Sequence, residues 1–133
     1  MPKENKNKKR RLLIFTAVVA LIALLAMHWK LQRVKVPPEL VGTWRTTNAR
    51  YADRSFQISL ASITFATGPG TESTGFIENI QAFQDHDGTL YTISYSAEGA
   101  HEQVSFYYDE LNGKKRIQFK NQQGIVWEKD ENS

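Results

Sequence analysis

The stretch Leu12–Trp29, LLIFTAVVALIALLAMHW, contains eighteen residues and no charged side chain. At ~1.5 Å per residue, a helix of this length spans ~27 Å, close to the ~30 Å hydrocarbon core of a bilayer. Arg10 and Arg11 precede the stretch, and Lys30 follows it. We therefore predict one transmembrane helix over residues 12–29.

Basic residues are concentrated on the N-terminal side of this helix. Residues 1–11 carry six Lys and Arg against the single Glu4, whereas Lys30, Arg33 and Lys35 follow the helix. The more positive flank stays in the cytoplasm. The chain also has no cysteine and no N-x-S/T acceptor, which favours a bacterial periplasm over a secretory lumen. We expect a single-pass protein of the bacterial inner membrane, with a cytoplasmic N-terminus and a periplasmic C-terminal domain.

A cleaved signal peptide is the alternative interpretation, because it also begins with basic residues and an apolar run. However, Leu24-Leu25-Ala26 places a bulky residue where a cleavage site needs a small one, and the apolar run is longer than a usual signal-peptide core. We therefore favour an uncleaved anchor.

The positive charge of the chain belongs to the membrane flanks. The whole chain has a net charge of +3, but residues 40–133 contain 8 Lys and Arg and 12 Asp and Glu, a net of −4. A basic tail beside a membrane helix is a topology signal that also meets anionic lipid headgroups. We expect contact with the lipid bilayer and no binding of nucleic acid.

The segments around the helix have different compositions. Residues 1–11 are too polar to bury apolar surface, so we predict a mobile tail. Residues 30–39 form a short stalk, in which the helix continues for a turn or two past Lys30 and must end at Pro37-Pro38. The stalk is short enough to hold the following domain, residues 40–133, near the bilayer.

From Leu40 onward the apolar residues recur with the period of a β-strand. Ser55–Leu60, SFQISL, alternates polar and apolar residues throughout. Glycine- and asparagine-containing turn signals separate the runs; they are Gly68-Pro69-Gly70, Asp85-His86-Asp87-Gly88, Glu98-Gly99, Asn112-Gly113 and Asn121–Gly124. We predict an all-β domain of about eight strands, each five to seven residues long, in an antiparallel barrel or sandwich. Phe76–Phe83 has two mixed faces, which indicates an edge strand or a bulge.

The ends of this domain resemble those of the calycins, the lipocalin and fatty-acid-binding-protein group. Leu40–Arg45, LVGTWR, is similar to their G-x-W opening strand, and Val126–Lys129, VWEK, to the closing strand of the fatty-acid-binding branch. The resemblance implies that Trp44 packs on the barrel floor near Lys129. It also implies a possible site for a small apolar ligand, lined by Trp44, Tyr91 and Tyr95. The domain departs from the family pattern because it has only about 94 residues and no predicted helical lid. We therefore expect side chains to fill so small a barrel.

Two further segments are candidates for interaction. Asn48–Arg54 places Arg50, Tyr51 and Arg54 close together, types that bind carboxylates, phosphates or protein interfaces; the alternative is a turn braced by Arg and Asp. In the helix, Thr16, Ala20 and Ala23 fall within ~60° of one another, so a second helix could approach closely. The alternative there is that alanine is simply common in membrane helices.

No stretch of the chain has a known catalytic or cofactor-binding motif. The three histidines occur in separate regions, and Asp85–Gly88 lacks most of a calcium loop. We expect no enzyme activity, no metal and no cofactor. The favoured hypothesis is a membrane-anchored, non-catalytic accessory or interaction subunit with a membrane-protein partner. The alternative is a tethered, lipocalin-like binder of a lipid or other small apolar ligand.

Overall fold

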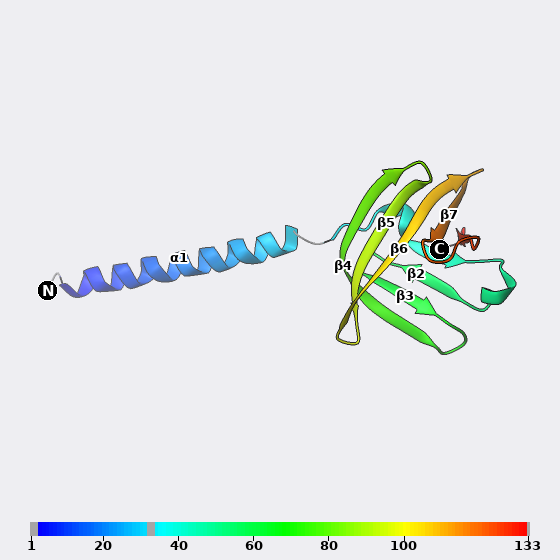
Figure 1. Ribbon diagram of the computed structural model, residues 1–133. Coiled ribbons are helices and arrows are strands. Elements are labelled where there is room, and N and C mark those ends of the chain that lie inside the picture. Colours follow the sequence, from blue (N-terminus) through cyan, green and yellow to red (C-terminus); the bar gives the residue numbers. More distant parts are fainter. Residues whose placement is uncertain (1–2, 32–33, 133) are drawn as a thin grey trace. The chain divides into compact units, whose positions relative to one another are not determined.

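The computed structural model describes residues 3–31 and 34–132 (Figure 1). The chain forms two compact units, Met1–Arg33 and Val34–Ser133. Among the described residues, the first unit contains one helix, and the second contains eight strands and two short 3-10 helices.

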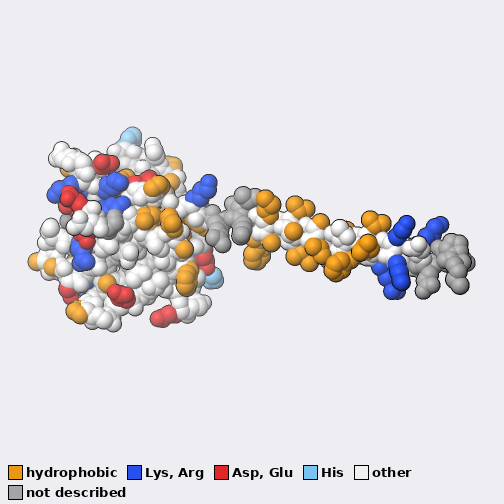
Figure 2. Space-filling view, turned by 180° about the vertical axis from the view of Figure 1, so that it is seen from behind, with side chains coloured by type: hydrophobic (Ala, Val, Ile, Leu, Met, Phe, Trp, Pro, Cys, Tyr) orange, Lys and Arg blue, Asp and Glu red, His pale blue; other side chains and the backbone are white. Residues whose placement is uncertain are grey.

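Helix α1, Lys3–Leu31, contains the apolar segment found in the sequence. Within it, Asn5–Trp29 forms a 25-residue stretch long and apolar enough to cross a membrane, and none of its side chains is buried. Lys and Arg side chains cluster at its N-terminal end, and apolar side chains cover the rest (Figure 2).

The N-terminal end of α1 differs from the prediction. The helix begins at Lys3, so most of the tail predicted to be mobile is helical; once a helix has nucleated, each added residue gains a backbone hydrogen bond. Beyond Lys30 the described helix reaches Leu31, and residues 34–37 are not helical, so the helix predicted to run a turn or two past Lys30 does not continue through Val34. Residues 32 and 33 lie outside the described ranges.

The second unit is a closed antiparallel barrel in which every strand pairs with its neighbour in sequence (Figure 1). Trp44 and Arg45 of β1 (Gly42–Arg45) pair with Lys129 and Glu128 of β8 (Trp127–Lys129) and so close the barrel. The prediction of about eight antiparallel strands is confirmed, and the architecture is a barrel rather than a sandwich. The elements are η1 Pro38–Leu40, β1 Gly42–Arg45, η2 Ala49–Tyr51, β2 Ser55–Ile58, β3 Ser62–Ala66, β4 Glu72–Asp85, β5 Gly88–Ala97, β6 Ala100–Leu111, β7 Lys114–Phe119 and β8 Trp127–Lys129.

Each of the five predicted turn signals connects two neighbouring strands. Asn112 and Gly113, between β6 and β7, have φ angles of 53° and 76°. Positive φ at both central residues is what a type I′ hairpin turn requires. The Asn-Gly signal therefore acts through its backbone, as predicted.

The strand lengths were predicted less well. β4, β5 and β6 contain 14, 10 and 12 residues rather than five to seven. Most of β4 is exposed, so backbone pairing with its neighbours extends it without an alternating apolar pattern. Its register shifts between Ile77 and Asn79, which is the bulge that the mixed faces of Phe76–Phe83 indicated.

Leu60 does not belong to β2, although SFQISL alternates throughout. β2 ends at Ile58, and Leu60 is 73% exposed. The Ser59 hydroxyl accepts from the Ser62 backbone N–H at 3.0 Å and lies 2.8 Å from the Ser62 hydroxyl. These side-chain bonds favour a tight turn at the position where the pattern predicted a longer strand.

Side chains fill the barrel. Seven large residues in the described part of the chain are essentially inaccessible; they are Trp44, Phe106, Leu40, Ile58, Ile63, Ile93 and Ile117. Val36 and Leu40 enter this core from the segment before β1. The residues just before β1 thus contribute side chains to the barrel interior.

Candidate functional site

Trp44 occupies the core next to the start of the barrel. Its indole Nε1–H donates to the Leu40 carbonyl at 3.0 Å, and its ring stacks on Phe56 with 6.0 Å between centroids. Tyr108 contacts it edge-on at 6.5 Å. Lys129 is its register partner in β8, so the two side chains lie on the same face of the barrel wall.

Tyr91 also packs against Tyr108, at 6.3 Å, which brings it into the same cluster as Trp44. Its hydroxyl donates to Glu39 Oε1 at 2.9 Å. Burial, followed by the hydrogen bond and the negative charge of Glu39, raises the pKa of Tyr91 to about 12. Burial is also the main reason why the pKa of Lys129 is lowered.

Tyr95 lies apart from Trp44 and Tyr91, over β3 and β4. Its ring packs 6.1 Å from Phe65 and covers Gly75, where a β-carbon would overlap the ring. Two of the three candidate ligand residues therefore meet through Tyr108, and the third packs against other residues. Trp44 and Tyr91 are 0% and 6% exposed and belong to the filled core.

The loop between β1 and β2 holds Arg50, Tyr51 and Arg54 together. Asn48 caps η2 by accepting from the Arg50 backbone N–H at 3.0 Å, and the Arg54 N–H donates to the Tyr51 carbonyl at 2.9 Å. The guanidinium carbons of Arg50 and Arg54 lie 5.6 and 5.1 Å from the centroid of the Tyr51 ring. At this separation each cation interacts favourably with the aromatic face.

Neither guanidinium is braced by a carboxylate. The ion pairs of residues 3–31 and 34–132 lie elsewhere, on Arg45, His101, Lys114 and Arg116. The Arg–Asp turn considered from the sequence is thus replaced by two arginines on one tyrosine. Asp53 lies next to Arg54 in the chain but forms no ion pair with either arginine, so both guanidinium groups keep their hydrogen-bonding capacity for carboxylates or phosphates.

Beside Tyr51 the surface opens into a recess of about 220 Å³. Tyr51 packs 6.4 Å from Trp127, which in turn contacts Phe56 at 5.3 Å and Phe119 at 6.0 Å. Arg54 and Gln122 line the recess as well. The sequence pointed to Tyr51 and Arg54 but not to Gln122 or Trp127 as their neighbours, because these residues come from opposite ends of the domain and no local spacing connects them.

The three small residues of α1 are all exposed along the helix. The Thr16 hydroxyl donates to the Leu12 carbonyl at 2.8 Å, so its hydrogen bond stays within the helix. The face of Thr16, Ala20 and Ala23 is thus suited to close packing rather than to polar contact between helices.

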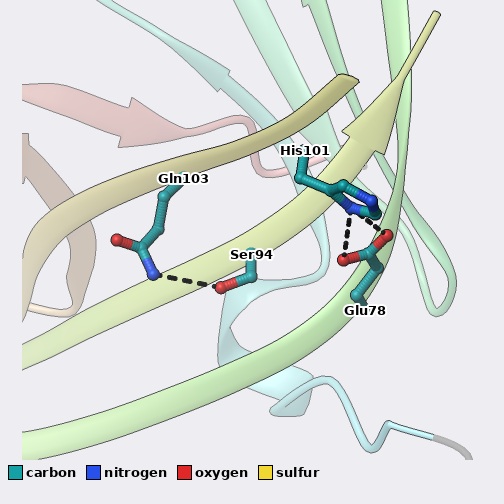
Figure 3. Close-up of polar contacts among 4 residues, drawn as sticks. All are labelled: Glu78, Ser94, His101 and Gln103. Carbon is teal, nitrogen blue, oxygen red and sulfur yellow. Dashed lines mark hydrogen bonds and ion pairs between the residues drawn. The ribbon is translucent and has the colours of Figure 1, made fainter. Parts of the chain in front are cut away.

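Polar side-chain contacts outside these regions lie on β4, β5 and β6 (Figure 3). The ring Nδ1 of His101 lies 2.9 and 3.1 Å from the carboxylate oxygens of Glu78, while Gln103 donates to the Ser94 hydroxyl at 3.2 Å. His101 is 81% exposed, so this pair contributes little to stability. Ser94 bonds to Gln103 rather than to the histidine, so the contacts do not form a nucleophile–base pair.

Within the described ranges, no group of three or more His, Asp or Glu side chains is placed to hold a metal ion. Comparison of the chain with family models, curated proteins and solved structures found no match.

Proposed function

We propose that this protein is a non-catalytic accessory or interaction subunit of a cell-envelope membrane complex. In this proposal α1 anchors the chain in the bacterial inner membrane, and the barrel lies on the periplasmic side. The filled core is the observation that carries the proposal: Trp44, Tyr91 and Phe106 occupy the interior in which a lipocalin-like protein would hold its ligand.

The positive charge flanking α1 supports the proposed orientation, with the N-terminus in the cytoplasm. The packing face of Thr16, Ala20 and Ala23 supports a helical partner within the membrane. The short connection from Trp29 to the barrel supports a role close to the bilayer surface, since few residues are available to extend it.

We further propose a calycin-like ancestry for the barrel. The up-and-down strand order, and the pairing of Trp44 with Lys129 across the closing strands, support it. Many antiparallel barrels share this strand order, so the proposal depends mainly on the G-T-W and W-E-K strands.

The test is purification of the full-length protein from its native membrane in a mild detergent, with mass analysis of accompanying proteins and lipids. We expect a stoichiometric membrane-protein partner. Changing Thr16, Ala20 and Ala23 together to Leu should remove it, because added bulk prevents close helix packing.

A matched variant adds bulk to the opposite face, through Ile14→Phe, Val18→Leu and Leu25→Phe, about 180° away at ~100° per residue. It should retain the partner. A lone monomer, or equal retention by both variants, would contradict the helix-mediated association. A single lipid species bound instead of a protein would favour the tethered-binder alternative.

A further inference from the structure

The recess beside Tyr51 has the apolar lining of a ligand site. Phe56, Phe65, Phe119 and Trp127 line it together with Val104. Its volume of about 220 Å³ lies below the range of ~300–1,000 Å³ that is usual for drug-sized ligands. An occupant must therefore be small and must present an apolar group to the aromatic side chains.

Two buried polar atoms of recess-lining residues have no hydrogen-bond partner within the described ranges. They are the indole Nε1 of Trp127, which can only donate, and Oε1 of Gln122, which can only accept. Trp127 is only 4% exposed. Both atoms are covered by protein atoms. Buried donors and acceptors in native proteins are nearly always paired, so a ligand that displaces the covering side chains and offers one acceptor and one donor would satisfy both atoms.

The third feature is positive charge at the same recess. Arg54 lines it, Tyr51 holds both Arg54 and Arg50 against its ring, and neither arginine has a carboxylate partner in the described part of the chain. A guanidinium pairs best with a carboxylate or phosphate, which it can hold through two parallel hydrogen bonds.

We propose that this recess binds a small N-acylated apolar amino acid through its side chain, its amide and its carboxylate. The side chain contacts the aromatic lining, and the amide offers a carbonyl to Trp127 and an N–H to Gln122. The carboxylate pairs with Arg54. This site is separate from the filled core around Trp44 and Tyr91, and it functions whether or not α1 has a helical partner.

The test uses the full-length protein in lipid nanodiscs, labelled with 5-fluorotryptophan and titrated with N-acetyl-L-phenylalanine. Trp29, Trp44 and Trp127 give three fluorine signals, and Trp127→Phe assigns the last. We expect a saturable shift of the Trp127 signal, with the Trp29 and Trp44 signals unchanged. Calorimetry on the same samples supplies the dissociation constant.

Arg54→Gln should weaken binding by about tenfold or more, because a hydrogen-bonded charge pair is lost. The matched control is Arg45→Gln, which removes an exposed arginine that is paired with Asp130 and does not line the recess. It should bind like the unchanged protein. The methyl ester of the ligand should bind the unchanged protein as weakly as the acid binds the Arg54→Gln variant.

Three results would overturn the proposal. These are the absence of saturable binding up to millimolar ligand, equal affinity for acid and ester, and a shift of the Trp44 signal in place of the Trp127 signal. Since the experiment does not involve a membrane partner, its failure leaves the proposed accessory function to its own test.

Discussion

Glu39 and Tyr91 connect the segment before β1 to the barrel wall. Glu39 lies in η1 and Tyr91 in β5, and the hydroxyl of Tyr91 donates to Glu39 Oε1 at 2.9 Å. Leu40, the next residue, is fully buried, and its carbonyl accepts from Trp44. Three groups thus fix the start of the barrel: the half-buried carboxylate of Glu39, the buried side chain of Leu40 and the backbone carbonyl of Leu40.

This contact predicts a loss of stability at high pH. Because the pKa of Tyr91 rises from 10.0 to about 12 on folding, the unfolded chain loses this proton first. The stability linked to neutral Tyr91 is fully present below about pH 10 and is lost as the pH rises towards about 12. Urea unfolding across this range should show a steeper fall in free energy for the unchanged protein than for Tyr91→Phe.

Glu39→Gln provides the control for the cause of the shift. Removing the negative charge should lower the pH at which the last tyrosine ionises, as followed by tyrosinate absorbance. The same titration curve for the variant and the unchanged protein would show that Glu39 does not hold the phenol in its neutral form.

At the scale of elements, β3, β4 and β5 pack closely at one glycine. Gly75 of β4 pairs with Ile63 of β3, and the Tyr95 ring of β5 occupies the space of the missing side chain. We predict that Gly75→Ala destabilises the barrel by about 1–3 kcal/mol, because the ring must move or the strands must separate. The midpoint of urea unfolding measures the effect.

The same substitution in a Tyr95→Leu variant tests whether the Tyr95 ring causes the destabilisation. With Tyr95→Leu present, Gly75→Ala should be nearly neutral, since alanine otherwise costs no more than glycine in a strand. An equal loss of unfolding free energy with and without Tyr95→Leu would show that the strain lies in the backbone of β4 instead.

The strands and the positions of the turns could be predicted because each depends on residues that are close together in the sequence. Asn112-Gly113 marks a turn through its own backbone angles, and Ile117 with Phe119 marks a buried face through period two. The long ends of β4 to β6 could not be predicted, because exposed paired strands need no apolar alternation. The alternating pattern wrongly predicted that Leu60 belongs to β2, because the hydroxyl of Ser59, rather than hydrophobicity, decides where β2 ends.

The candidate site was predicted only in part, for a related reason. Arg50, Tyr51 and Arg54 are neighbours in sequence, so their association was visible. The recess combines them with Phe65, which β3 contributes, and with Trp127 of β8. Only closure of the barrel between β1 and β8 brings these segments together.

On the scale of the whole molecule, a filled barrel is combined with a helix of membrane-spanning length. α1 has no buried side chain in its apolar stretch, whereas the barrel has a core of its own. Such an exposed apolar helix is stable in a bilayer or in contact with another helix. The proposed accessory function therefore requires that α1 remains attached and spans the membrane.

Cysteine labelling combined with intact-mass analysis tests this requirement directly, and the natural chain contains no cysteine to interfere. Asn7→Cys and Glu131→Cys place single thiols at exposed positions in the helix N-terminus and beyond β8. In intact spheroplasts, a membrane-impermeant maleimide should label the Glu131→Cys variant. It should label the Asn7→Cys variant only after lysis. The intact mass of each protein should include α1. Labelling in the opposite order, or a mass lacking α1, would contradict an uncleaved anchor with an external barrel.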